Sequence, residues 1–194
     1  MATITKPTAQ SGTLSAAEYI KANLNEIGKL LQSELRKELQ AQGHKATGSL
    51  INSIEYTVGI YTGQLALIVE YLEYGQIQNE GVKPNRIPYG NGSGGGQASL
   101  YITALQEWVM RKGISTNGSE ALGIAFAIAK THAKEGMPTN GSYRYSTNGR
   151  RLGFQDYVLA QQSDAIVAQL SDGLSEGYLA ELDTFLSQQI TITI

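Results

Sequence analysis

Histidine is the residue type in this sequence that could most readily act as a metal ligand or a general base, and the chain has two, His44 and His132. No HExxH motif or similar spacing pairs them, and each lies near the end of an expected helix, where the helix dipole alone favours histidine. The chain has no Cys, which excludes thiol nucleophiles and Cys-ligated metals. We therefore predict no catalytic, metal or cofactor site.

Two other patterns resemble fragments of active sites. Gly90 to Gly96 has five glycines in seven positions, but no Gly-Lys-Ser or Gly-Lys-Thr follows, so we interpret it as a loop and not as a phosphate site. Glu70 and Glu73 lie three apart on an expected strand, which directs them to opposite faces and makes a poor acid and base pair. An enzyme is not expected.

A basic and aromatic cluster is the remaining candidate site. It consists of Tyr143, Arg144, Tyr145, Arg150 and Arg151. Such side chains could contact phosphates and stack on bases, although a solvated loop or a contact with an acidic protein surface explains them equally well.

The distribution of charge along the chain bears on this cluster. Residues 130–151 carry five basic and one acidic group, whereas residues 152–194 carry six acidic groups and no basic one. This segregation indicates charge pairing, either within the fold or between neighbouring copies. The whole chain has 15 basic and 17 acidic residues, which argues against a dedicated nucleic-acid binder.

Hydrophobic periodicity indicates the elements that would position these residues. Ser15 and Glu18 form a capping box before a long amphipathic helix that ends near Gly43. A helical turn at 50–54 precedes two strands, 55–61 and 64–71, which alternate around a tight glycine turn as in a hairpin. Three further helices are expected, at 99–112, 119–135 and 164–189.

Two of these helices have unusual composition. The helix at 119–135 is apolar almost all round, so we expect it to be the buried central helix. In the last helix, Gly173 and Gly177 each weaken helix formation by about 1 kcal/mol and could produce a kink.

The sequence therefore predicts an α+β fold, with a long N-terminal helix, a small antiparallel sheet based on a β-hairpin, three further helices packed on it, and long irregular loops. Residues 1–14 are expected to form an arm and residues 15–194 a single domain with long loops at 76–98 and 137–153. Ala2 to Thr5 and Ile190 to Ile194 alternate like short strands. The longest nearly apolar run has eight residues, too few to span a membrane.

Two short motifs occur in a fixed order within this arrangement. The first follows the long helix and consists of Thr47, Gly48, Leu50, Ser53 and Ile54, and the second, Glu73-Tyr74-Gly75, follows the hairpin. In this order they resemble the tail-completion and neck (minor capsid) family of tailed bacteriophages. That family has a Thr-Gly-x-Leu-x-x-Ser-Ile signature, followed by a hairpin ending in Glu-aromatic-Gly-Thr. Gln76 stands where the family has the final Thr.

The motif residues are expected to be structural. Gly48 should free the turn from helix to strand, and Leu50 and Ile54 should face the core. Gly75 should end the strand, at a point where Tyr74 turns inward.

The resemblance implies a structural virion protein with no turnover. It implies a homo-oligomeric ring at the portal–tail junction, a head–tail connector that joins portal to tail and lines or seals the DNA channel. The implied partners are portal, tail or adjacent ring proteins, with non-specific contact to packaged DNA and no membrane. The implied location is the neck or tail of the virion, assembled in the host cytoplasm.

One hypothesis about the ring and two alternatives to it follow from the same residues. Ring closure needs heterologous interfaces, so we hypothesise that the basic loop of one copy meets the acidic C-terminal segment of the next and that reversing the charges of Arg150 and Arg151 weakens the ring. The alternatives are a nucleic-acid-binding accessory protein that uses the Arg144–Arg151 loop, or another virion tail component.

Overall fold

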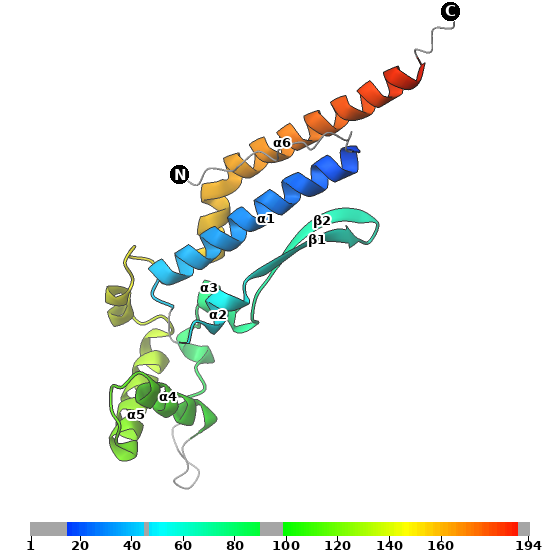
Figure 1. The fold of residues 1–194 in the computed structure, drawn as a ribbon. Helices are drawn as coiled ribbons and strands as arrows, with labels where there is room; N and C mark the ends of the chain where they lie inside the picture. The colour runs from blue at the N-terminus through cyan, green and yellow to red at the C-terminus, as the bar shows by residue number, and fades with distance from the viewer. Residues whose placement is uncertain (1–14, 45–46, 90–98, 190–194) are drawn as a thin grey trace, which may run out of the picture. The chain divides into compact units, whose positions relative to one another are not determined.

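The computed structural model describes residues 15–44, 47–89 and 99–189 (Figure 1). These residues form six α-helices, two short 3-10 helices and a two-stranded antiparallel sheet, which confirms the α+β class. The arm, the Gly90–Gly96 stretch and the two short strands expected near the termini lie outside the described residues. Where the sequence indicated one domain, the chain divides into two compact units.

The first unit takes its described residues from Met1–Glu38, Ser49–Leu72 and Gln155–Ile194. Most of α1 (Ala16–Ala41) belongs to this unit. The helix begins with the expected capping box. The Ser15 amide donates to Glu18 Oε2 over 2.8 Å, and the Glu18 amide donates to Ser15 Oγ over 3.4 Å. The hydrogen bonds that the Ser15 amide and the Ser15 hydroxyl donate to the Glu18 carboxylate lower the pKa of Glu18. The apolar stripe of the helix is buried as expected, at Ile27, Leu31, Leu35 and Leu39.

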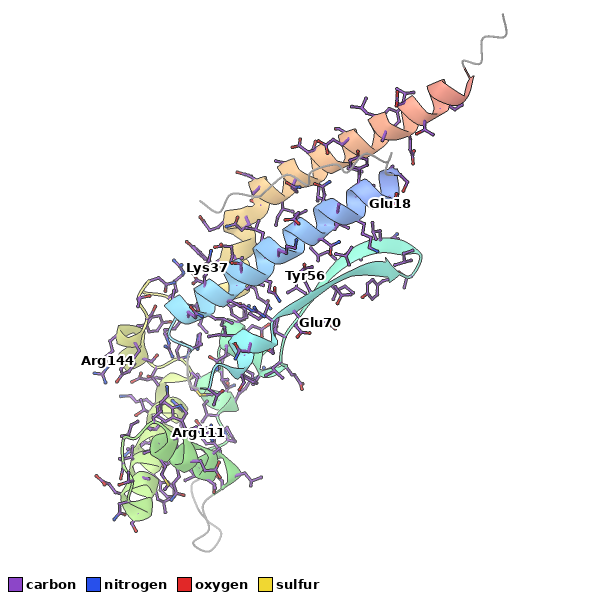
Figure 2. All side chains as sticks on the ribbon, viewed as in Figure 1. Glu18, Lys37, Tyr56, Glu70, Arg111 and Arg144 are labelled. Carbon is purple, nitrogen blue, oxygen red and sulfur yellow. The ribbon has the colours of Figure 1, made fainter. Side chains whose placement is uncertain are left out.

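A short helix and the hairpin follow in the same unit. Helix α2 (Ser49–Ser53) leads into β1 (Glu55–Tyr61) and β2 (Gln64–Glu70), in a register that pairs Tyr56 with Val69. Figure 2 shows Tyr56 between the hairpin and α1. A Cβ added at Gly28 of α1 would lie 2.3 Å from Cδ2 of Tyr56. The helix therefore accepts the tyrosine ring only because residue 28 has no side chain.

Helix α6 (Phe154–Gln189) begins at Phe154, ten residues before the expected start at Asp164, and runs unbroken through both of its glycines. A Cβ at Gly173 would lie 2.4 Å from Nδ2 of Asn23, and one at Gly177 would lie 3.0 Å from Cα of Ala16. Since the α6 numbers rise as the α1 numbers fall, the two helices are antiparallel. The glycines that weaken α6 as an isolated helix thus allow its backbone to approach α1 closely.

The second unit comprises Leu39–Gly48 and Glu73–Phe154. Its elements are α3 (Tyr74–Glu80), η1 (Pro84–Arg86), α4 (Leu100–Arg111), α5 (Gly118–Glu135) and η2 (Asn140–Tyr145). The expected loop at 76–98 is therefore wrong at its start, where α3 continues to Glu80 and η1 follows. The stretch 137–153 is irregular apart from the short turn of η2.

Helices α4 and α5 pack around the core of this unit. Ile102, Ala125 and Ala129 form its buried centre. The expectation that α5 is buried all round is wrong, because Phe126 is 43% exposed. The buried face of α5 consists of alanines, and small side chains allow two helices to approach closely without needing large apolar groups.

Candidate interaction surfaces

The two histidines have structural surroundings. His44 Nε2 lies 3.2 Å from the carbonyl oxygen of Arg151, and His132 Nδ1 lies 2.6 Å from the hydroxyl of Tyr101. Burial lowers the pKa of both histidines, and the positive charge of Arg151 lowers the pKa of His44 further. Because their pKa values are lowered, both imidazoles are stabilised in the neutral form. Within residues 15–44, 47–89 and 99–189, no three His, Asp or Glu side chains are grouped to hold a metal ion.

Acidification from pH 7.5 to pH 5.5 is expected to lower the stability of the second unit. A histidine whose folded pKa lies below its unfolded value of about 6.5 contributes fully above that pH, and the contribution is lost as pH falls towards the folded pKa. Urea unfolding followed by fluorescence of Trp108, the single tryptophan, measures this unit. The double variant His44→Asn, His132→Asn should lose part of the pH dependence. An unchanged pH dependence in that variant would contradict the assignment.

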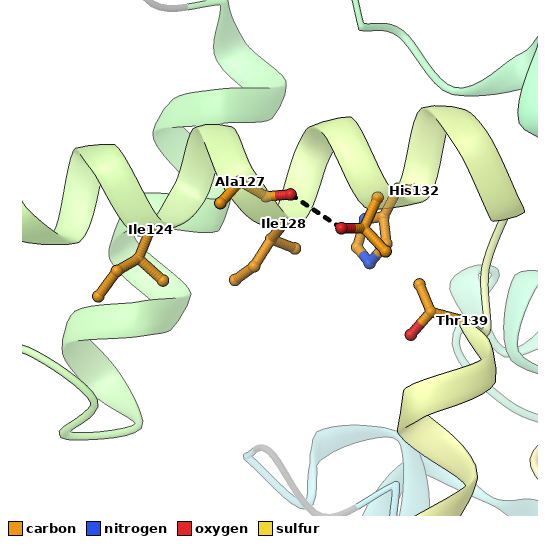
Figure 3. Close-up of a pocket in the computed structure, with 6 residues that line it drawn as sticks. Ile124, Ala127, Ile128, His132 and Thr139 are labelled. Carbon is orange, nitrogen blue, oxygen red and sulfur yellow. Dashed lines mark hydrogen bonds between the residues drawn. The ribbon is translucent and has the colours of Figure 1, made fainter.

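A hollow of about 300 Å³ lies beside α5 (Figure 3). Its lining is mostly apolar. The hydroxyl of Thr131 donates to the carbonyl of Ala127 over 3.0 Å, and His132 Nδ1 is paired with the hydroxyl of Tyr101. The hollow therefore offers a mainly apolar surface. Its lining residues are Ile124, Ala127, Ile128, Thr131, His132 and Thr139.

The basic cluster divides into an internal part and an exposed part. Arg151 Nη1 donates to the carbonyl of Gln42 over 2.7 Å, and the amide of Thr147 donates to the carbonyl of Ala41 over 2.8 Å. These carbonyls belong to the last residues of α1, so the stretch 146–151 caps the C-terminus of that helix. Burial lowers the pKa of Arg151, although the guanidinium stays charged. Arg150 is half-buried, and its amide donates to Asn148 Oδ1 over 3.1 Å.

The exposed part of the cluster lies on η2 and consists of Tyr143, Arg144 and Tyr145, which we call the η2 surface (Figure 2). The guanidinium carbon of Arg144 lies 4.8 Å from the centre of the Tyr145 ring, and Arg144 Nη2 donates to the Tyr145 hydroxyl over 2.8 Å. Tyr145 is 63% exposed. Tyrosine and arginine are the side chains that most often dominate binding energy at protein interfaces.

The first motif has the structural roles expected of it. Gly48 has a φ of 75°, a left-handed conformation that favours glycine, and Leu50 and Ile54 are buried. Thr47 is exposed. Ser53, for which no role was expected, donates its hydroxyl to the carbonyl of Leu50 over 2.9 Å and accepts from the amide of Leu72 over 3.1 Å. Ser53 therefore ties the end of the hairpin to α2.

The second motif differs from its expected geometry. Gly75 lies buried in the first turn of α3 and does not end a strand, and Tyr74 is 41% exposed and not turned inward. Glu73 immediately precedes that helix, whereas Glu70 ends β2 opposite Glu55, so the two carboxylates do not share a strand.

The C-terminal half of α6 carries an exposed apolar surface. Leu174, Tyr178, Leu182 and Phe185 recur at intervals of four, four and three residues, which places them on one side of a helix, and we call them the α6 stripe. Their exposed fractions are 56%, 68%, 41% and 58%. Exposed apolar residues grouped in this way indicate an interaction surface.

Glu181 is exposed and lies on the same side of α6, three residues after Tyr178 and four before Phe185. The α6 stripe is therefore both apolar and acidic.

None of the helices in the described part of the chain is long and apolar enough to span a membrane. No protein-family model matches the sequence, and neither the curated proteins nor the solved structures include a significant match.

Proposed function

We propose that this protein is a structural virion component that assembles as a ring at the junction between portal and tail. The observation that carries the proposal is the order of the two motifs around the hairpin, which resembles the phage neck and tail-completion family. The order comprises the long helix α1, the turn at Thr47 and Gly48, helix α2, the hairpin, and Glu73-Tyr74-Gly75.

The surfaces of the structure support a role in assembly. The α6 stripe and the η2 surface together expose seven large side chains, six of them apolar or aromatic. A monomeric protein rarely exposes a contiguous apolar patch without a binding role. The hairpin adds a further opportunity, since a two-stranded sheet has two edges at which a neighbouring strand can pair.

Assembly on the portal is the direct test. The purified protein is mixed with a portal protein from the same source, and the products are measured by light scattering and negative-stain electron microscopy. We expect a discrete ring of this protein on the portal. A monomer that ignores the portal and instead retains DNA in a salt-dependent manner would overturn the proposal and favour a nucleic-acid-binding accessory protein.

A further inference from the structure

The α6 stripe lies on a different side of α6 from the side that contacts α1. Gly173 and Gly177 mark the side in contact with α1, and the stripe lies roughly a third of a turn around the helix from them, as the 3.6-residue repeat requires. Gly177 lies against Ala16, the first residue of α1. Tyr178, Leu182 and Phe185 therefore lie beyond the described start of α1, where Figure 1 shows α6 continuing.

Charge determines which kind of surface can cover the stripe. The last 43 residues, 152–194, contain six acidic side chains and no basic one, and Glu181 lies within the stripe. Pairing α6 with α6 of another copy would bring acidic groups together, which disfavours that arrangement. The complementary surface has to be basic and must also present apolar or aromatic side chains.

The second unit of the same chain has these properties. It carries ten basic and five acidic residues, whereas the first unit carries five basic and twelve acidic ones. On its η2 surface, Arg144 is exposed between two exposed tyrosines. Two aromatic rings can pack on the apolar side chains of the stripe while the guanidinium meets a carboxylate.

We propose that the η2 surface of one copy docks on the α6 stripe of a second copy, with Arg144 beside Glu181. The two surfaces differ, so the contact is heterologous: it leaves a free α6 stripe on one copy and a free η2 surface on the other, to which further copies can add until a ring closes. The inference rests on the proposed function only for the ring; the pairwise contact stands without it. Among residues 15–44, 47–89 and 99–189, both surfaces are exposed, and their complementary charge makes a second copy the partner of suitable chemistry.

Charge reversal tests the pair. Sedimentation of the full chain at low salt should show self-association that Arg144→Glu and Glu181→Lys each weaken about tenfold or more, as expected for a central charged pair. The double variant, or a mixture of the two single variants, restores opposite charges and should recover association. Asp172→Lys is the matched control, because Asp172 is exposed on the same helix but off the stripe, and it should leave association unchanged.

Crosslinking identifies the partner surface even where association is weak. A photo-crosslinking residue replaces Tyr145 in a mixture of isotopically light and heavy chains, and mass spectrometry distinguishes links between copies. Links from position 145 to residues 174–185 of another copy are expected. If the labelled chain forms no such links, or links position 145 only to other parts of the second copy, the docking proposal is overturned.

The same measurements with portal protein present separate the two proposals. Rings that form on the portal and are unaffected by Arg144→Glu and Glu181→Lys would refute the docking contact and leave the connector function standing. Association that depends on both residues, in a protein that never joins the portal, would refute the connector function and leave the contact standing. Salt-dependent DNA retention that requires Arg144 but not Glu181 would refute the docking contact.

Discussion

Replacing Gly173 by alanine is expected to destabilise the protein by about 1–3 kcal/mol, the usual cost of overpacking a closely packed contact. The new Cβ would lie 2.4 Å from Nδ2 and 3.0 Å from Cβ of Asn23. Asn23 cannot easily move aside, because it is 3% exposed, donates to the carbonyl of Tyr19 over 2.9 Å and accepts a hydrogen bond from Gln169. The two helix backbones would have to separate, with loss of these contacts.

Gly123→Ala provides the matched control. Gly123 also lies inside a helix, α5, but an added Cβ meets nothing within 4 Å. Alanine should therefore stabilise the protein there by about 0.5–1 kcal/mol through the ordinary difference in helix propensity. Urea unfolding followed by far-ultraviolet circular dichroism measures both variants. If Gly173→Ala raises the midpoint as Gly123→Ala does, the close approach of α1 and α6 is incorrect.

The sequence is a good guide where the determinants are local. Three features depend on residues only a few positions apart, and each was predicted from those residues. They are the capping box at Ser15, the ends of β1 and the turn of the hairpin. Helix α5 shows the limit of this reasoning. Its composition indicated a buried central helix. Which face is buried depends on how α5 packs against α4, and this packing buries the alanines and leaves Phe126 exposed.

The glycines of α6 show a second limit. Sequence propensity counts Gly173 and Gly177 only as weak points, since their benefit comes from α1, about 150 residues earlier in the chain. The apolar residues at 174, 179 and 182 were part of the pattern that predicted this helix, and they are exposed in the described structure. Periodicity locates an apolar face but does not say whether the chain itself or another molecule covers it.

The candidate site was found in part from composition. The tyrosines and arginines between 143 and 151 were identified as a group. Residue type alone could not separate the internal role of Arg151 from the exposed surface formed by Tyr143, Arg144 and Tyr145. The difference depends on the end of α1, which lies beside the stretch 146–151 and receives Arg151. A hydrogen bond between residues 42 and 151 leaves no local signal in either segment.

Arg151→Glu is therefore expected to destabilise the second unit, and not simply to weaken contacts between copies. The substitution removes the hydrogen bond from Nη1 to the carbonyl of Gln42 and places a carboxylate beside the negative end of α1. Loss of a charged hydrogen bond and burial of an unpaired polar group together should cost about 2–4 kcal/mol. Trp108 fluorescence during urea unfolding measures the loss.

Arg144→Glu is the control that gives the result its meaning. It makes the same charge change seven residues earlier, on an exposed side chain that contacts its neighbour Tyr145. Its free energy of unfolding should stay within about 0.5 kcal/mol of the wild-type value. If Arg151→Glu also leaves stability unchanged, the cap on α1 is incorrect and Arg151 returns to the candidates for contact between copies. If only Arg151→Glu is destabilised, any loss of assembly in that variant reports folding, and Arg144 is the residue with which to measure the interface.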